Sequence, residues 1–250
     1  MVDTSTINEL LEQFSPSEAR NEADYHGYEA FFRSSDRALE RRAEELKFLV
    51  DDIIKRSKNT SSWLDVGCGS GNLLSVLNSR DIASYGIEMD DDLAFKALSV
   101  SPTVFCGSAL VILERFVEIG IKFDVVTCLH LIEHLDWNDA NHLLELMRKV
   151  SSDHGLVVVV TPNTKDIDVV AGSFYRDPTH LRQYPIELLE FMFYRTSMNV
   201  ILSHTFNRFY DEETIANEKS KFMRAGQLID RAQNLIARSK DLINKAKIDD

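Results

Sequence analysis

From residue 62 to residue 160, short apolar segments typical of strands alternate with longer segments typical of helices. The strand-like segments are 62–66, 84–88, 103–106, 123–129 and 155–160, and the helix-like segments lie at about 71–80, 91–99, 108–119 and 138–150. A helix that joins two parallel strands must cross one face of the sheet. The alternation therefore predicts an α/β protein whose doubly wound, mostly parallel sheet carries helices on both faces.

Segments of a different kind flank this alternation. Residues 36–56 have apolar side chains at helical spacing and predict an N-terminal helical cap within residues 1–57. A helix at about 185–196 and a strand at 199–206 are predicted to complete a Rossmann-like domain over residues 58–210. In residues 211–250, apolar and small side chains recur at alternating spacings of three and four, which predicts a C-terminal heptad-type, amphipathic helix.

This C-terminal helix is basic, with eight Lys or Arg and three Asp or Glu between residues 214 and 248. Its apolar stripe consists of Leu228, Ile229, Leu235, Ile236, Leu242 and Ile243. A lone helix cannot hide such a stripe from water, so we expect another surface to cover it. Self-association or a partner protein is the expected cover, in the manner of a coiled coil, and peripheral contact with an anionic membrane is the alternative.

The whole chain of 250 residues is acidic, with a formal net charge of −12 and a pI of about 5.1. Broad electrostatic binding of nucleic acid needs a basic face, so no nucleic-acid partner is expected. No apolar run has the length of a transmembrane segment, and the first residues do not resemble a signal peptide. The three cysteines lie in or beside apolar strand-like segments, which predicts reduced, buried thiols and a cytoplasmic location.

A glycine-rich turn follows the first predicted strand and opens a helix. It reads Leu-Asp-Val-Gly-Cys-Gly-Ser-Gly and contains the candidate cofactor-binding residues Asp65, Gly67, Cys68, Gly69 and Gly71. Glycines allow a tight turn and a close approach of the backbone to a ligand. The spacing G-x-G-x-G differs from the G-x-G-x-x-G that seats a pyrophosphate, and a carboxylate directly before it favours a ligand with a cationic amino group.

Further candidate cofactor contacts stand where the next predicted strands end. A carboxylate at the end of the second strand can accept hydrogen bonds from both hydroxyls of a ribose. The ends of the third and fourth strands provide a hydroxyl, backbone groups and an imidazole at the edge where ligands bind in such sheets. These residues are Glu88, Met89, Ser108, Ala109, Leu129 and His130.

The set of motifs from Trp63 to Thr161 resembles class I methyltransferases. That resemblance implies S-adenosyl-L-methionine as the cofactor, bound by the residues named above, and it implies that residues 58–210 form the methyltransferase domain. Ser108 departs from the pattern, because many members of this class have an aspartate there that binds the adenine amino group.

A second, narrower resemblance concerns the acceptor side of the site. Asp177-Pro178-Thr179-His180, followed by Leu, Arg and Tyr-Pro, resembles a loop of bacterial polysaccharide methyltransferases of the O-antigen chain-terminating type. The segment 28–35, which includes Arg33, is similar to an N-terminal motif of the same enzymes but lacks its glycine. The resemblance implies O-methylation of a glycan or glycan-linked group in cell-surface polysaccharide synthesis. The guanidinium group makes Arg33 a candidate ligand of the cofactor carboxylate or of an acidic acceptor such as a phosphate.

The candidate catalytic residues are Glu133, His134 and His180. A sugar hydroxyl is a poor nucleophile at neutral pH, and imidazole has a suitable pKa for a general base. His180 acting as the base and His134 serving only to shape its loop are comparable interpretations. A third is a divalent metal held by these residues and His130. It resembles the E-x-x-E-H and distant His of small-RNA 2′-O-methyltransferases, with His130 in place of the first acid.

Three alternatives to a glycan methyltransferase are also compatible with these residues. The first is methylation of a small metabolite, and the second is methylation of an RNA end. The third is a scaffold protein that keeps the cofactor pocket without turnover. The acidic charge counts against RNA, and a metabolite enzyme would not need a basic C-terminal helix.

Overall fold

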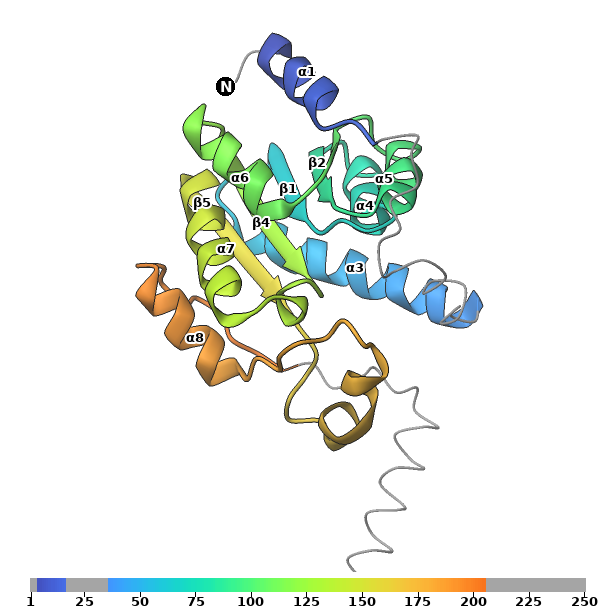
Figure 1. Ribbon diagram of the computed structural model, residues 1–250, viewed down its shortest axis with the longest axis vertical. Coiled ribbons are helices and arrows are strands. Elements are labelled where there is room, and N and C mark those ends of the chain that lie inside the picture. Colours follow the sequence, from blue (N-terminus) through green and yellow to red (C-terminus); the bar gives the residue numbers. More distant parts are fainter. Residues whose placement is uncertain (1–3, 17–35, 206–250) are drawn as a thin grey trace, which may run out of the picture. The chain divides into compact units, whose positions relative to one another are not determined.

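The structure, a computed structural model, describes residues 4–16 and 36–205 (Figure 1). Five strands form one sheet in the order β3-β2-β1-β4-β5, and every neighbouring pair is parallel. The strands are β1 (Ser62–Val66), β2 (Ala83–Glu88), β3 (Val104–Cys106), β4 (Phe123–Leu129) and β5 (Ser151–Val160). The strand order reverses between β1 and β4. Ligands of such sheets bind at this switch point, outside the carboxyl ends of the strands.

Helices cover both faces of the sheet, because each strand presents apolar side chains alternately to the two sides. Trp63 and Val125 face a cluster with α3 (Asp36–Arg56) and α4 (Asn72–Asn78), and α5 (Asp91–Leu98) packs against β2 and β3 beside α4. Leu64 and Val126 face a larger cluster with α6 (Ala109–Glu118), α7 (Trp137–Val150), α1 (Thr4–Gln13) and α8 (Ile186–Arg195). Figure 1 shows these helices along the sheet. The predicted doubly wound fold is confirmed.

Two aspartates determine where two of the crossover helices begin. The side chain of Asp90 accepts a hydrogen bond from the backbone N–H of Leu93 (2.9 Å), so α5 begins directly after it. The side chain of Asp136 accepts hydrogen bonds from Asn138 N and Asp139 N (2.7 and 2.9 Å) at the start of α7. Such caps satisfy backbone donors that have no partner within the helix.

The predicted strand at 199–206 is wrong for its described part. Residues 199–205 form no strand, and Val200, Ile201 and Leu202 are exposed. A strand needs a hydrogen-bonded neighbour, and no described segment pairs with the outer edge of β5. The local preference of β-branched residues for extended backbone is therefore not enough to form a strand here.

Within the described residues 4–16, the chain forms a helix that the sequence patterns did not predict. Helix α1 buries Leu10 in the larger cluster, and Phe14 O accepts a hydrogen bond from Cys106 N (2.6 Å) at the end of β3. Helix α3 agrees with the predicted helix 36–56 and packs on the sheet through Val50 and Ile53. The domain boundaries and the capping role of residues 1–57 stay predictions.

The predicted C-terminal helix and its apolar stripe lie outside the described residues. Within residues 4–16 and 36–205, no helix has the length and apolar character needed to cross a membrane.

Candidate cofactor and acceptor site

The glycine-rich turn connects β1 to α4 in a conformation that requires glycine. Gly67, Gly69 and Gly71 have φ angles of 77°, 54° and 84°, in the left-handed region where a side chain causes strain. A Cβ at Gly67 would lie 3.1 Å from the Leu131 side chain, and a Cβ at Gly71 would lie 3.1 Å from Ala97 Cα. At Gly69 a Cβ would meet nothing within 4 Å, so this glycine borders open space at the carboxyl edge of the sheet.

Cys68 turns its side chain into the protein and away from that open space. It is buried, and a Cβ at Gly86 on β2 would lie only 2.7 Å from its Sγ. Burial raises the pKa of all three cysteine thiols, which are free. Only the backbone of Cys68 therefore belongs to the turn, and its thiol is not a nucleophile.

Asp65, the acid before the turn, is a buried carboxyl group. Its Oδ1 accepts a hydrogen bond from Thr127 Oγ1 on β4 (2.7 Å), and Thr127 Oγ1 in turn accepts one from Trp63 Nε1 (3.1 Å). No described lysine, arginine or histidine forms an ion pair with it. Burial raises the pKa of Asp65 to about 7, and the Thr127 hydrogen bond opposes that rise only in part. A buried carboxyl group of this kind fits a cationic ligand.

The raised pKa of Asp65 predicts a pH-dependent contribution to stability. Above pH 4 the carboxyl is ionised in the unfolded chain but keeps its proton in the folded one until about pH 7, so its contribution to stability falls as pH rises. The free energy of unfolding of Asp65→Asn should therefore rise by about 2 kcal/mol relative to that of the unliganded wild type when the pH changes from 5.5 to 8. Urea denaturation at both pH values measures this gain. A constant difference between the two proteins contradicts the raised pKa.

Glu88 ends β2 and connects it to the glycine-rich turn. Its Oε2 accepts a hydrogen bond from Gly69 N (2.8 Å), and its Oε1 accepts bonds from Met89 N and Asp90 N (2.8 and 2.9 Å). Burial raises the pKa of Glu88 against the effect of these three donors. The carboxylate of Glu88 therefore holds the turn in place, and its contact with ribose hydroxyls stays a prediction.

The remaining predicted cofactor residues lie at strand ends. Met89 is 61% exposed after β2, and Ser108 directly precedes α6, which begins at Ala109. Leu129 ends β4, and His130 follows it with a φ of 55° and an exposed side chain. Arg33 lies outside the described residues.

The three candidate catalytic residues lie together. Glu133, His134 and His180 each offer one ligand atom, and these atoms all lie within 4.8 Å of one another. Glu133 and His134 belong to a short 3-10 helix, η1 (Ile132–His134), that follows β4, and His180 comes from the loop after β5. The two imidazole rings meet edge to face with centroids 4.7 Å apart. His130, the fourth predicted ligand, is not in this group but has its Nδ1 3.3 Å from Glu133 Oε1.

Glu133 is a fully buried carboxylate that remains ionised. Thr161 Oγ1, just beyond β5, donates a hydrogen bond to its Oε2 (3.0 Å). Burial alone would raise the pKa of Glu133, but the hydrogen bond and charge of His130, with smaller contributions from a backbone donor and His134, lower it overall. Its backbone carbonyl accepts bonds from Leu181 N and Arg182 N (2.8 and 3.1 Å), which ties the loop of His180 to η1.

The two histidines differ in their surroundings. Burial lowers the pKa of His134, against smaller effects of the Glu133 and Asp177 carboxylates and of the Thr179 backbone, which favours the neutral ring. His180 lies against the Phe174 ring, with centroids 4.5 Å apart, and its Nδ1 lies 2.7 Å from Phe174 O. Neutral imidazole and carboxylate are the donors that divalent transition metals prefer, so the chemistry of the set fits such an ion.

Four further residues contact the candidate site residues, and the sequence patterns did not predict these contacts. They are the hydroxyl residues Thr127, Thr161 and Thr179 and the acid Asp177, each of which touches a candidate residue. The Thr-His part of the loop motif gave a signal for Thr179. Nothing in the sequence distinguishes Thr127 or Thr161 from an ordinary strand threonine, because only the pairing of β4 with its neighbours brings them to the acids.

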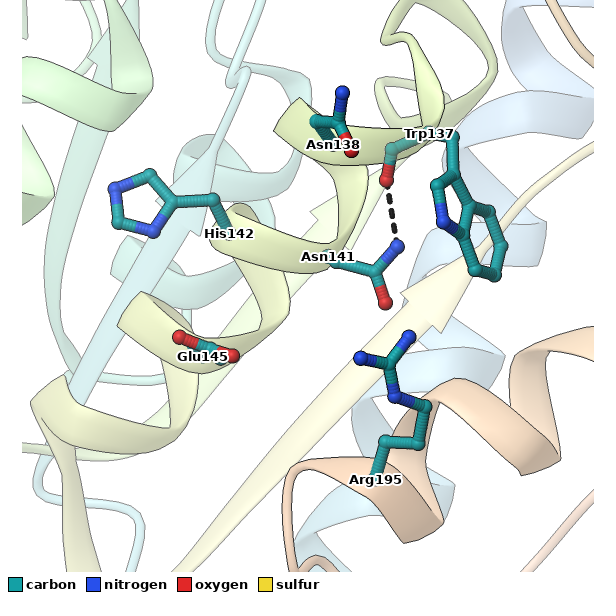
Figure 2. A pocket seen from close by; sticks show the side chains of 6 residues that line it. All are labelled: Trp137, Asn138, Asn141, His142, Glu145 and Arg195. Atoms are coloured by element: carbon teal, nitrogen blue, oxygen red, sulfur yellow. Dashed lines mark hydrogen bonds between the residues drawn. The ribbon is translucent and has the colours of Figure 1, made fainter.

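A polar pocket of about 250 Å³ lies elsewhere, on the surface of α7 and α8 (Figure 2). Its lining consists of Trp137, Asn138, Asn141, His142, Glu145 and Arg195. Asn141 donates a hydrogen bond to its own helix, at Trp137 O (2.6 Å), and His142 Nε2 pairs with Glu114 on α6 (2.8 Å). None of the candidate site residues lines this pocket.

Comparisons with known proteins agree with this fold. A crystal structure of an S-adenosylmethionine-dependent methyltransferase from Archaeoglobus fulgidus matches with a TM-score of 0.59 at 23% identity, covering 81% of this chain and 92% of the other. The magnesium protoporphyrin IX methyltransferase of Synechocystis PCC 6803, with bound S-adenosylmethionine, matches with a TM-score of 0.54 at 14% identity, covering 84% and 94%. At these identities the likeness concerns the fold.

Curated relatives match over a shorter stretch. The small RNA 2′-O-methyltransferase of Rattus norvegicus is 28% identical over 149 residues, which is 52% of this chain and 36% of the rat protein. The Mus musculus protein of the same name is 27% identical over the same shares. The match thus spans about a third of the length of these relatives.

The family itself follows from a longer match. The model of the methyltransferase domain family matches residues 19–226, which include the glycine-rich turn, the ends of all five strands and the histidine cluster. The chain therefore belongs to the methyltransferase domain family.

Proposed function

We propose that this methyltransferase transfers the methyl group to a sugar hydroxyl, with a divalent cation held by Glu133, His134 and His180. The observation that carries the proposal is the meeting of one buried carboxylate and two imidazoles at the carboxyl edge of the sheet. Leu131, two residues before Glu133, has its side chain 3.1 Å from where a Cβ on Gly67 would stand, which supports a cluster close to the predicted cofactor site.

On the cofactor side, the proposed roles follow from where the residues lie. Asp65 would hold the cationic amino group of S-adenosylmethionine, and the buried carboxyl group without a described cation supports this. Glu88 would bind the ribose hydroxyls while it holds Gly69 in place. The open space at Gly69 supports a ligand beside the turn. Met89, Ser108, Ala109, Leu129 and His130 would line the rest of the cofactor.

The reaction needs a deprotonated hydroxyl in line with the sulfonium. An oxygen lone pair forms the new O–CH₃ bond while the S–CH₃ bond breaks, and the hydroxyl proton goes to a base. A bound divalent cation would acidify the hydroxyl as a Lewis acid. Where His180 is not occupied as a ligand, it is the proposed base, and its contacts with Phe174 hold the ring in place. Glu133 contributes the negative charge that a cation requires.

The first candidate acceptor is a glycan or glycan-linked group. The loop of residues 177–185 supports this acceptor through its resemblance to a loop of bacterial polysaccharide methyltransferases. His180 of this loop belongs to the cluster. We also propose that the protein is cytoplasmic, and its three cysteine thiols, which form no disulfide, support this location.

The second candidate acceptor is the 2′-hydroxyl at an RNA end. The similarity to the small RNA 2′-O-methyltransferase of Rattus norvegicus supports it over roughly half of this chain. A net charge of −12 opposes extended contact with RNA, but a single terminal ribose needs no broad basic face.

Label transfer from S-adenosylmethionine tests the proposal. The full chain is incubated with cell-envelope glycans, with a short RNA, and with the same RNA after periodate has destroyed its 3′-terminal diol. We expect transfer to one of the first two, loss of at least about 100-fold in EDTA, and recovery with Mn²⁺. Calorimetric titration with Mn²⁺ gives an independent measure of the metal. Full activity in EDTA argues against the cation, and S-adenosylhomocysteine binding without transfer to any acceptor supports a scaffold.

A further inference from the structure

A chain of hydrogen bonds runs from Asp177 through Thr179 to His134. Asp177 Oδ1 accepts hydrogen bonds from the backbone N–H of Thr179 (2.9 Å) and from its hydroxyl (2.5 Å). Thr179 Oγ1 also lies 2.8 Å from His134 Nδ1. Asp177 is 8% exposed, so these contacts are shielded from water.

The direction of the bonds follows from what each group can donate. The single hydroxyl hydrogen of Thr179 is used on Asp177, so only lone pairs of Oγ1 remain for His134. His134 Nδ1 must therefore carry the hydrogen. In a neutral imidazole the other nitrogen, Nε2, then holds the lone pair.

The second imidazole of the cluster also uses Nδ1 as a donor, but toward a different group. Phe174 O can only accept, so His180 Nδ1 donates to it at 2.7 Å. His180 Nε2 lies 3.6 Å from Asp177 Oδ2, the other oxygen of the carboxylate that holds Thr179. The same carboxylate thus contacts both the support of His134 and the ring of His180.

We propose that Thr179 and Asp177 are positioning residues that hold His134 as the Nδ1–H tautomer, so that its Nε2 binds a divalent cation together with Glu133 and His180. The inference rests on the proposed metal-assisted function. Such partners behind a ligating histidine typically contribute 10- to 100-fold to metal affinity. The loop motif Asp-Pro-Thr-His accordingly contains the proposed ligand His180 and two supporting residues. Thr179 acts through His134, and Asp177 acts through Thr179 and also lies beside His180.

The best variant to test this is Thr179→Val, because Asp177 also organises the turn. Asp177 accepts the backbone N–H of Thr179, and its own carbonyl accepts His180 N (3.3 Å), so changes at Asp177 would move the loop. Valine matches threonine in shape and lacks the hydroxyl, whereas Thr179→Ser keeps it. Thr196→Val, in which the lost hydroxyl bonds only to carbonyls at the end of α8 (2.8 and 3.3 Å), is the matched control.

Mn²⁺ titration of the full chain gives the first measurement. Thr179→Val should weaken Mn²⁺ binding about 10- to 100-fold, while Thr179→Ser and Thr196→Val stay near wild type. S-adenosylhomocysteine affinity should be unchanged in all three. Nitrogen NMR of labelled histidine should show the Nδ1–H form of His134 in the wild type and lose it in Thr179→Val.

Different results would contradict the positioning role alone or the metal-assisted function as well. Equal Mn²⁺ affinity in the wild type and Thr179→Val, or an Nε2–H form of His134 in the wild type, overturns the positioning role and leaves the metal-assisted function standing. A wild type that binds no divalent ion overturns both. Weakened Mn²⁺ binding in Thr196→Val as well shows a general loss of stability and also overturns the positioning role.

Discussion

Replacing His180 by alanine is expected to lower turnover by about 10² to 10⁴ while leaving the affinity for S-adenosylhomocysteine within about threefold of wild type. His180 lies in the cluster with Glu133 and His134, and its ring is held by Phe174 on the loop after β5. The glycine-rich turn belongs to β1 and α4. Loss of the imidazole therefore removes the proposed ligand or base without changing the groups proposed to bind the cofactor.

Single-turnover rates and calorimetric titration measure the two quantities separately. His142→Ala is the matched control, because His142 is a histidine of α7 whose Nε2 pairs with Glu114 on the surface. Mn²⁺ titration of His180→Ala distinguishes the two proposed roles. Loss of a ligand would weaken Mn²⁺ binding, whereas loss of a base that does not bind the metal would leave the Mn²⁺ affinity unchanged. A loss of turnover of only a few-fold would mean that His180 serves the packing of its loop.

The second large effect concerns the cofactor. Asp65→Ala and Glu88→Ala should each weaken S-adenosylhomocysteine binding by about 100-fold or more, because each leaves a charged or hydroxyl group of the ligand without its buried partner. Wild-type affinity should also depend on pH. The ionised form of Asp65 binds the amino group, and its pKa in the unliganded protein is about 7, so affinity rises with pH up to about 7 and then levels off.

Titrations at pH 5.5, 7 and 8.5 provide the measurement, and Asp124→Ala gives a control acid. Asp124 lies on β4 and its carboxylate bonds to Ser61 and Ser62 at the opposite, amino end of β1. Circular dichroism shows whether each variant keeps the fold. Near-native affinity in both Asp65→Ala and Glu88→Ala would remove the assignment of the cofactor site.

The sequence by itself determined the doubly wound sheet and the location of most site residues. Apolar segments with a period of two or 3.6 identify strands and helices locally, and β1 and β4 agree with their predicted bounds. In a parallel sheet, the residues that follow each strand reach one edge. Asp65, Glu88 and the 130–134 segment could therefore be placed there without coordinates.

Only the tertiary structure decided what these groups touch. The sequence predicted a strand at 199–206, but a strand needs a neighbour, and none of the described segments supplies one to residues 199–205. The metal interpretation included His130 as a ligand, yet the structure gathers Glu133, His134 and His180. Thr127 and Thr179 bond to residues 62 and 45 positions away, at Asp65 and His134. Hydrogen bonds between such distant residues depend on how the strands and loops are brought together, which no local pattern records.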